Sequence, residues 1–488
     1  MHRAGRWICA FTLAPAMTVP MLLVGFDSDV PAAPSPPPAR PNIVLVLADD
    51  LDRADLARFP QISALRRSGA SFDNAIVTDS WCCPSRSTIL RSQYVHSHGV
   101  KTNNPPDGGW PVFRRRGLEA STVGTWLHSA GYRTGLIGKY LNGYPGPSVP
   151  PGWDDWRVPT PRHMYAQRDF VLIENGKPCP YKKGHLDDVL TWKADAFIRS
   201  TPAGKPFFLY LAPLAPHLPA PYAPRHAGAF AGVRAPRTAS FDRASSGDAR
   251  WLARRPPLGR AQTARIDRVY RDRLRSTLSV DDMIGSLTRT LAATGRLNDT
   301  YLFFASDNGF HLGQHRLAPG KTTAFDEDVR VPLIVRGPGI VPGATIPSLA
   351  GTVDLAPTFA DLAGAGVPSF AEGRSLVPLL RGGPPTPWRT GMLVEFFAGH
   401  VKKRPEGPDC DTRTRHGCPL PPTYAAIRTS RYTYVEYSTG ERRLYDRLTD
   451  PAEMRPRTPT GVLARTMHAW LARYRSCKAE SCRRADQR

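Results

Sequence analysis

Three apolar stretches constrain the fold of this chain more than any other feature. They are residues 42–48, 205–211 and 300–305, and each is rich in β-branched or aromatic side chains. Such runs are typical of strands that are buried on both faces of a sheet. Segments with helical spacing, among them residues 118–130 and 265–294, lie between the runs. The alternation predicts an α/β domain in which helices cover a sheet.

Polar residues follow each of these strands directly. Asp49 and Asp50 come after the first strand, His217 after the second, and Asp307 and Asn308 after the third. In an α/β sheet the functional site lies outside the carboxyl ends of the strands, so these residues are expected to meet there. The carboxylate and amide oxygens suit Ca²⁺ or Mg²⁺, whereas zinc and copper favour His and Cys ligands. From spacing alone, His217 could equally be a packing residue.

A helix start with two cysteines lies at residues 82–86, Cys-Cys-Pro-Ser-Arg. Pro84 suits the first turn because the amide hydrogen that it lacks would be unpaired there. The free amides of a helix N-terminus and the guanidinium of Arg86 both favour a bound anion. Cys82 would therefore lie where a nucleophile and an oxyanion meet. The alternative is a buried thiol pair or a disulfide cysteine.

The run at residues 82–86, followed by Gln93-Tyr94-Val95-His96, resembles the signature of the type I sulfatases. The resemblance implies an alkaline-phosphatase-like mixed sheet sandwiched by helices and one Ca²⁺ or Mg²⁺ per chain. It also implies that a formylglycine-generating enzyme converts Cys82, not Cys83, to Cα-formylglycine. The hydrated aldehyde is the nucleophile in this family and coordinates the cation. Cys82 is therefore expected as a metal ligand beside Asp49, Asp50, Asp307 and Asn308.

The same resemblance implies roles for residues in further motifs. Gly138-Lys139 corresponds to an active-site lysine near the sulfate, and Lys321 to a sulfate-binding lysine. His217, preceded by Pro216, corresponds to a sulfate-binding residue or leaving-group acid. The expected catalytic residues are Cys82, Arg86, Lys139, His217 and Lys321.

One histidine of the family pattern is missing here. Many sulfatases carry it two residues after the active-site lysine, where this chain has Leu141. His96 and His98, just after the cysteine-bearing helix, are candidates for that proton-transfer role and are expected to bind substrate, although both could be surface histidines. His311 is expected in the substrate pocket, with its role left open.

The reaction expected from these motifs is the hydrolysis of a sulfate ester in a small molecule or glycan. Residues 82–86, 138–142 and 278–282 most resemble the branch with N-acetylglucosamine-6-sulfatase and the heparan-sulfate endosulfatases. The chain lacks the long basic insertion of those endosulfatases, so their substrate is not carried over. One alternative is a phosphatase or phosphonate hydrolase on the same fold, because phosphate and sulfate esters share their geometry. Another is a non-catalytic polyanion-binding relative.

The net charge of the chain bears on which classes of partner it could bind. A net charge of +23 would suit nucleic acid, an anionic membrane or an acidic substrate. The sequence contains neither a basic module interleaved with aromatic residues nor zinc-finger spacing, so we expect no nucleic-acid partner. Much of the arginine is scattered through Ala-, Pro- and Gly-rich sequence, and a sulfated substrate is compatible with it.

The first residues are expected to direct export. Residues 1–32 begin with basic side chains, continue through an apolar stretch and end in small residues, as a signal peptide does. Residues 33–41 form a proline-rich spacer. A retained membrane anchor is the alternative, because the apolar run approaches spanning length. No later stretch is long and apolar enough to span, so stable membrane insertion is not expected.

The cysteine count agrees with an exported protein. Without Cys9 in the presumed signal and Cys82 at the helix start, six cysteines remain, and an even number suggests disulfides. Cys410 with Cys418 and Cys477 with Cys482 are the closest pairs in sequence. Cys83 could equally remain a free buried thiol.

Near residue 385 the sequence pattern changes from long buried strands and helices to shorter strands with alternating apolar residues. A catalytic domain at 42–385 is expected to precede a small C-terminal domain at 386–488, built from short alternating strands and a helix at 462–474. Within the earlier helical segment 265–294, Asp281 and Asp282 are expected on a solvated face.

Overall fold

A ten-stranded mixed sheet organises the structure, a computed structural model that describes residues 40–161, 164–245, 247–383, 388–399 and 420–487. The three apolar stretches form its adjacent central strands β8, β1 and β7, which run parallel. Strand β9 pairs antiparallel with β8 and β2, and β5 pairs antiparallel with β4 and β6. In sheet order the strands are β10 (Thr345–Gly351), β2 (Ala70–Ile76), β9 (Leu333–Arg336), β8 (Thr300–Ser306), β1 (Asn42–Ala48), β7 (Phe207–Ala212), β3 (Arg133–Gly138), β4 (Asp155–Pro159), β5 (Phe170–Glu174) and β6 (Lys177–Tyr181).

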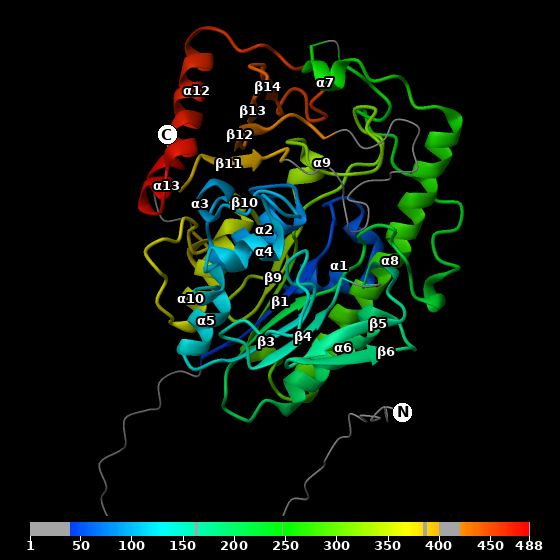
Figure 1. The fold of residues 1–488 in the computed structure, drawn as a ribbon, viewed down its shortest axis with the longest axis vertical. Helices are drawn as coiled ribbons and strands as arrows, with labels where there is room; N and C mark the ends of the chain where they lie inside the picture. Colours follow the sequence, from blue (N-terminus) through cyan, green and yellow to red (C-terminus); the bar gives the residue numbers. More distant parts are fainter. Residues whose placement is uncertain (1–39, 162–163, 246, 384–387, 400–419, 488) are drawn as a thin grey trace, which may run out of the picture. The chain divides into compact units, whose positions relative to one another are not determined.

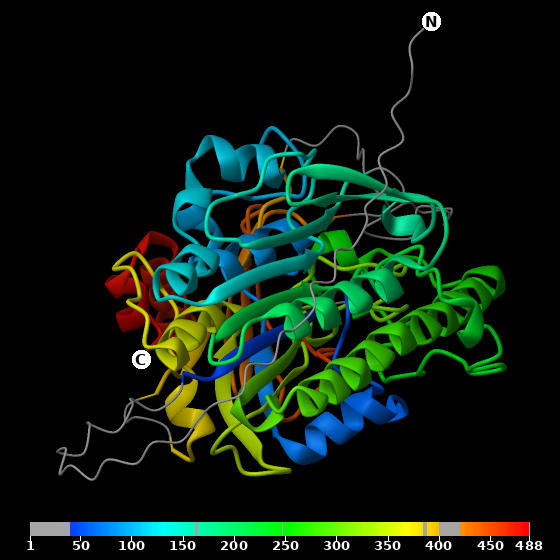
Figure 2. The same cartoon turned by 90° about the horizontal axis from the view of Figure 1, so that it is seen from below.

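Helices cover both faces of this sheet, which confirms the predicted fold class (Figures 1 and 2). Along β1, Ile43 and Leu45 pack into one core, while Val44 and Val46 pack into the other. This alternation explains why the strand reads as a continuous apolar run. The first core includes α2 (Cys82–Arg91), α5 (Val123–Ser129) and α10 (Leu355–Ala363). The second includes α1 (Pro60–Ser68), α6 (Leu186–Ser200) and α8 (Arg260–Ala293).

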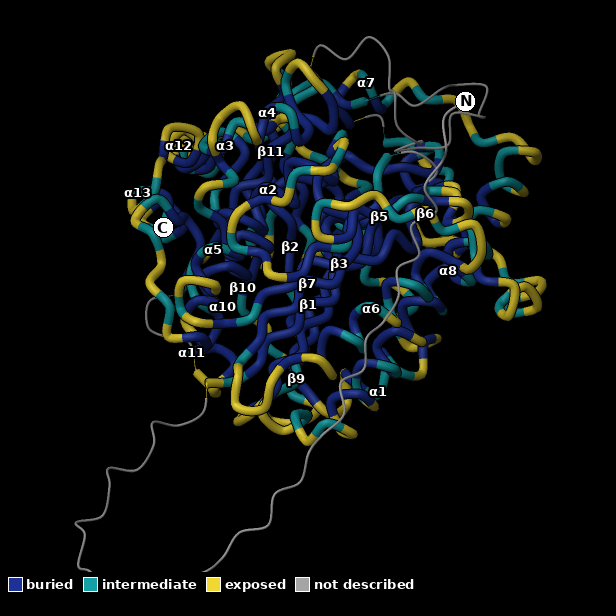
Figure 3. Tube along the Cα trace, turned by 60° about the horizontal axis from the view of Figure 1, so that its bottom comes forward, coloured by how far each residue is buried: buried dark blue, intermediate teal, exposed yellow. Residues whose placement is uncertain are grey.

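Short helices complete the described part of the chain. They are α3 (Val95–His98), α4 (Gly109–Arg115), α7 (Arg250–Ala253), α9 (Asp326–Val329) and α11 (Val377–Leu380). Figure 3 shows the central strands as buried chain, with the exposed segments at the periphery. A site at the ends of the central strands is therefore surrounded by protein on most sides.

The prediction for Asp281 was wrong. Its side chain is buried, and its Oδ1 accepts the N–H groups of Gln61 and Ile62, each at 2.8 Å. These amides belong to the first turn of α1, where a helix has no internal acceptors. Asp281 thus caps another helix. Asp282 is exposed and pairs with Arg225, as expected for a solvated face.

A separate antiparallel sheet follows, as predicted for the C-terminal part. Its strands are β11 (Gly391–Phe396), β12 (Tyr424–Thr429), β13 (Tyr432–Tyr437) and β14 (Arg442–Asp446), in that order. The helices α12 (Gly461–Ser476) and α13 (Glu480–Ala485) complete it. Trp470 of α12 and Trp81, which precedes α2, belong to the same apolar core as this sheet. Both sheets lie in one compact unit, and the domain boundary at residue 385 stays a prediction.

The predictions for the N-terminus lie largely outside the described residues, which begin at Arg40. They are the signal peptide at 1–32 and most of the spacer at 33–41. The pair Cys410/Cys418 also lies outside the described residues. The disulfide between Cys477 and Cys482 is confirmed. Among the described residues, no helix has both the length and the apolar character needed to cross a membrane.

A buried ion network joins the C-terminus to the main sheet. Arg389 is 4% exposed and binds both carboxylate oxygens of Asp354, at 2.6 and 2.7 Å. Its Nε lies 3.3 Å from Asp486, which follows α13. We expect Arg389→Met to lower the free energy of unfolding by about 3–5 kcal/mol, because the buried carboxylate of Asp354 loses the guanidinium that binds both of its oxygens. Urea unfolding checks this against Arg381→Met, an exposed control expected within about 0.5 kcal/mol of the parent. Equal losses in both variants would contradict it.

Candidate active site

The residues after β1 and β8 meet because the two strands lie in register. Ala48 pairs with Ser306, so Asp49 and Asp50 emerge beside Asp307 and Asn308. The Asp50 N–H donates to Asp307 Oδ1 at 3.1 Å, and Asn308 Nδ2 donates to Asp50 Oδ1 at 2.8 Å. All four residues are fully buried. The oxygen cluster predicted from the two motifs therefore forms at the carboxyl edge of the sheet.

Helix α2 brings Cys82 and Arg86 to this cluster. Cys82 is its first residue, and its Sγ lies 3.6 Å from Asp49 Oδ1 and 3.7 Å from Asp50 Oδ1. Arg86, four residues later, lies on the same face of the helix. Its Nε donates to Asp307 Oδ2 at 2.7 Å, and its Nη1 donates to the carbonyl of Lys139 at 2.9 Å.

Two lysines complete the cluster. Lys139, which follows β3, places Nζ 2.7 and 2.9 Å from the two carboxylate oxygens of Asp49. Lys321 places Nζ 2.7 Å from Cys82 Sγ and also pairs with Asp50. Burial by itself lowers the pKa of Lys139, but Asp49, Cys82 and Tyr165 together outweigh it and hold that pKa well above the ordinary value.

The charges of the cluster compensate one another. Three cations, from Arg86, Lys139 and Lys321, face the three carboxylates of Asp49, Asp50 and Asp307. Burial raises the pKa of Asp307, but the positive charges of Arg86, Lys139 and Lys321 together outweigh it and lower that pKa below the ordinary value. Such a balance admits a metal cation together with an anionic ligand, because the pair adds little net charge to a buried site.

The oxygen donors fit a hard cation. Asp50 Oδ2 and Asn308 Oδ1 are buried and have no hydrogen-bond partner among the described residues. Ligand atoms of Asp49, Asp50, Cys82 and His217 lie within 4.8 Å of one another. Buried oxygens with unused lone pairs are what Ca²⁺ or Mg²⁺ requires.

The thiol of Cys82 is not activated in its unmodified form. Burial raises its pKa well above the ordinary value, and the ammonium groups of Lys139 and Lys321 do not reverse this. A neutral thiol is a poor nucleophile, because the thiolate is the reactive form. A nucleophile at this position therefore requires chemistry other than thiolate attack.

His217 joins the cluster from the loop after β7. Its Nε2 lies 3.8 Å from Asp50 Oδ2, and its Nδ1 lies 2.6 Å from the carbonyl of Leu218. The ring of Tyr165, in a short turn of helix at Met164–Ala166, stacks on the imidazole with centroids 4.3 Å apart. The same ring lies 5.3 Å from Lys139 Nζ. Sequence analysis missed Tyr165, because nothing in its local pattern sets it apart from other aromatic residues.

His311 lies next to the loop that carries Lys321. The backbone N–H of His311 donates to the carbonyl of Gly320, and the N–H of Gly320 donates to the carbonyl of His311. The Nδ1 of His311 lies 2.9 Å from Asp328 Oδ1. The N–H and hydroxyl of Thr323 donate to the same carboxylate, at 2.9 and 2.7 Å. The imidazole of His311 is thus oriented by a buried carboxylate beside the cluster.

His98 is not brought to the cluster. It is buried beneath α2, where its Nε2 lies 3.2 Å from Thr88 Oγ1 and its Nδ1 accepts the N–H of Val100. Burial lowers the pKa of His98 to about 3, so the ring is neutral. Leu141, at the position of the missing histidine, is buried in the core. His98 therefore supports the helix and does not replace that histidine.

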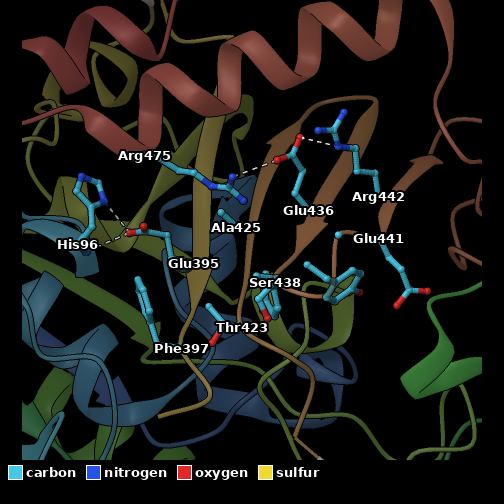
Figure 4. Close-up of a pocket in the computed structure, with 13 residues that line it drawn as sticks. His96, Glu395, Phe397, Thr423, Ala425, Glu436, Ser438, Glu441, Arg442 and Arg475 are labelled. Atoms are coloured by element: carbon cyan, nitrogen blue, oxygen red, sulfur yellow. Dashed lines mark hydrogen bonds and ion pairs between the residues drawn. The ribbon is translucent and has the colours of Figure 1, made fainter.

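His96 lies elsewhere, at one end of a pocket of about 490 Å³ on the small sheet (Figure 4). Its Nδ1 lies 2.8 Å from Glu395 Oε2, and its Nε2 lies 2.9 Å from the carbonyl of Cys477. Both ring nitrogens are thus occupied by internal partners. The predicted role of His96 in substrate binding has no support in this geometry.

The pair of His96 and Glu395 predicts a dependence of stability on pH. Burial lowers the pKa of His96, but the hydrogen bond to Glu395 and its charge, with the carbonyl of Cys477 and the charge of Glu372, together outweigh it and raise that pKa to about 9 from 6.5. A raised pKa stabilises the folded state fully below pH 6.5, and this contribution is lost as the pH rises through about 9. We expect His96→Gln to destabilise the protein more at about pH 6 than at about pH 10. Thermal unfolding at both values measures this, and a pH-independent difference would contradict it.

Comparison with known protein families gives two matches. A model described as Sulfatase matches residues 41–365. A model described as N-sulphoglucosamine sulphohydrolase, C-terminal, matches residues 313–461. The two matches together span both sheets.

Several curated proteins are similar over most of the chain. N-acetylglucosamine-6-sulfatase of Homo sapiens is 34% identical over 481 residues, which cover 91% of this chain and 86% of the relative. The protein of the same name from Capra hircus is 33% identical, with 91% and 85% covered. The extracellular sulfatase SULF-1 homolog of Drosophila melanogaster is 37% identical, with 70% of this chain but 31% of the relative covered.

Solved structures share the fold. One is described as a complex with its substrate, D-glucosamine-2-N,6-O-disulfate; its TM-score is 0.78 at 24% identity, with 92% of this chain and 99% of the other covered. A phosphonate monoester hydrolase of Agrobacterium radiobacter has a TM-score of 0.69 at 20% identity, with 91% and 96% covered. At these identities the likeness concerns the fold alone.

Proposed function

The chain belongs to the sulfatase family and hydrolyses sulfate esters, and we propose that its substrate is the 6-O-sulfate of a glucosamine unit. The proposal on the substrate is supported by the N-acetylglucosamine-6-sulfatases, which are similar to 91% of the chain. The observation that carries the chemistry is the charge-balanced cluster around Cys82, with its two unpartnered oxygens.

We propose that Cys82 is converted to formylglycine by a formylglycine-generating enzyme. The buried thiol supports this, because burial raises its pKa well above the ordinary value and so disfavours the reactive thiolate. The modified residue would supply a hydrated aldehyde as nucleophile at the N-terminus of α2. Asp49, Asp50, Asp307 and Asn308 would hold one Ca²⁺ or Mg²⁺, which when bound supplies positive charge opposite the sulfuryl oxygens.

The residues of the chain itself account for most of the expected sulfate binding. Lys321 contacts Cys82 Sγ, and Arg86 and Lys139 bind Asp307 and Asp49 in the same cluster, so that buried carboxylates already orient these donors. Charges that are preorganised in a water-poor site stabilise a transition state without a cost of reorganisation. His217, whose Nε2 lies 3.8 Å from Asp50 Oδ2 and whose Nδ1 contacts the carbonyl of Leu218, is one candidate to protonate the departing alcohol, and Lys321 is the other.

The test is a comparison of substrates with the matured protein. We expect sulfate release from N-acetylglucosamine-6-sulfate with a kcat/KM at least about tenfold above that for galactose-6-sulfate, because a buried hydrogen-bonding site rejects an altered hydroxyl. Aryl phosphate should react more slowly than aryl sulfate. Equal rates on both hexose sulfates would overturn the substrate, and faster phosphate hydrolysis would favour the phosphatase alternative.

Maturation is tested on the tryptic peptide of residues 68–86. A mass about 18 Da below that of the cysteine form is expected from the change of thiol to aldehyde. Co-expression with the modifying enzyme should raise the modified fraction. An active protein whose peptide retains both thiols would overturn the proposed modification.

We also propose that the protein is exported. Extracellular sulfatases among its relatives support this, as does the predicted signal peptide. N-terminal sequencing of the protein from the culture medium and the cell envelope would find a start near residue 33. A full-length N-terminus in a membrane fraction would favour the retained anchor.

A further inference from the structure

We propose that Arg273, in the middle of α8, is a positioning residue that sets the geometry of the cation site. It touches none of the reacting groups. Its side chain instead joins the loops that carry Asp50, His217 and Asn308. The inference rests on the proposed cation site and assigns a function to a residue outside the motifs.

The guanidinium of Arg273 contacts all three loops. Its Nη1 donates to the carbonyl of Pro216 at 3.1 Å, and its Nη2 donates to the carbonyl of Asp50. Pro216 directly precedes His217. The guanidinium carbon lies 4.0 Å from the centroid of the Phe310 ring, two residues after Asn308. One side chain thus cross-links the ends of β1, β7 and β8.

The burial of this cation has no other evident reason. Arg273 is 4% exposed, and burial lowers its pKa. The nearest carboxylate oxygen with which it pairs belongs to Asp52, 3.9 Å away. A buried charge without a close ion pair is costly, so its hydrogen bonds to the two carbonyls must compensate. The planar fork of arginine reaches both carbonyls at once, which the single ammonium of lysine cannot do in the same geometry.

The backbone of Asp50 explains why such a brace is needed. Its φ is +69°, in the left-handed region that non-glycine residues seldom adopt. Its N–H is held by Asp307 and its carbonyl by Arg273, so the strained residue is clamped on both sides. This clamp keeps Asp50 Oδ2, which accepts no hydrogen bond from the described residues, in the cluster. If the brace is lost, the backbone is free to relax and that oxygen moves away from the cation.

The experiment compares Arg273→Met and Arg273→Lys with Arg268→Met. Arg268 lies on the same helix and is exposed, so it controls for the loss of one arginine from α8. Each protein is stripped with EDTA and titrated with Ca²⁺ alone, and the rise in Tm gives an affinity that does not depend on turnover. We expect Arg273→Met to raise the half-saturating Ca²⁺ concentration by about 10–100-fold, as loss of outer contacts does at metal sites. Arg273→Lys should give a smaller rise, and Arg268→Met none.

The rate of sulfate-ester hydrolysis then shows whether Arg273→Met disturbs the position of the cation ligands or the folding of the protein. In saturating Ca²⁺ we expect kcat of Arg273→Met to recover at least in part, with little change in KM. Unchanged Ca²⁺ affinity in a folded Arg273→Met would overturn the inference. If that variant does not fold, Arg273→Lys decides by the same criterion. If the parent binds Ca²⁺ but releases no sulfate, the proposed function fails, while a weakened Ca²⁺ response in Arg273→Met still supports the brace.

Discussion

Cys82→Ala is expected to abolish sulfate release while the protein remains folded. The side chain lies at the convergence of Lys321, Asp49 and Asp50, and alanine offers no nucleophile there. We expect kcat to fall by at least about 10⁴-fold, as when the nucleophile of a covalent mechanism is removed. The loss of one buried sulfur should cost only about 1–2 kcal/mol of stability.

Cys83→Ala is the matched control. Cys83 is equally buried, but it packs in the core on one face of the sheet. We expect a similar loss of stability with most of the activity retained. Sulfate release and thermal unfolding of both variants check the pair. An active Cys82→Ala enzyme would refute the proposed chemistry.

Cys82→Ser extends the same test. The serine hydroxyl can attack sulfur and expel the alcohol, which leaves a serine sulfate ester on the protein. A hydrated aldehyde carries a second hydroxyl group that can expel the sulfate, whereas serine has none. We therefore expect one turnover and a mass increase of about 80 Da on the peptide of residues 68–86. Sustained turnover would show that release does not need the aldehyde.

Asp50→Asn is expected to have the second largest effect. Asp50 contributes the unpartnered Oδ2 and is the partner of Lys321. The neutral amide weakens cation binding and removes the negative charge that Asp50 places beside the buried ammonium of Lys321. We expect kcat to fall by about 10²–10⁴-fold and the stabilisation by Ca²⁺ to disappear.

Asp55→Asn serves as the control for this variant. Asp55 lies in the same loop, but its carboxylate pairs with Arg58 and Tyr270. We expect its Ca²⁺ response and its kcat to match those of the parent. Calorimetric unfolding with and without Ca²⁺ measures the difference, and a normal response in Asp50→Asn would exclude Asp50 from the cation site.

The candidate cluster was largely predictable because its residues follow strands whose burial is visible in the sequence. A continuous apolar run identifies β1 and β8, and the register of parallel neighbours brings the residues after them together. The motif at residues 82–86 is also local, since the placement of Arg86 one turn after Cys82 follows from helical geometry. Lys139 and Lys321 needed the family resemblance, because an isolated lysine carries no such signal.

The positions of the two histidines after α2 could not be predicted from the neighbouring sequence. His96 and His98 are two residues apart, yet one contacts the small sheet and the other lies under α2. Proximity in sequence to Cys82 suggested a shared site. Which way each ring points is decided by Glu395 and Thr88, which come from different elements of the fold.

Residues of the helix α8 likewise have roles that the sequence alone does not distinguish. Arg268 and Arg273 belong to one arginine-rich stretch, and neither spacing nor composition distinguishes the exposed residue from the buried one. Asp281 and Asp282 are adjacent, yet only the first caps α1. The sequence by itself determined the central strands, the nucleophile helix and the residues at the strand ends, because the burial pattern and the helical spacing depend on residues that are close together in the chain. The tertiary structure alone decided the roles of Arg273, Tyr165, Asp281, His96 and His98, because their partners come from segments that only folding brings together.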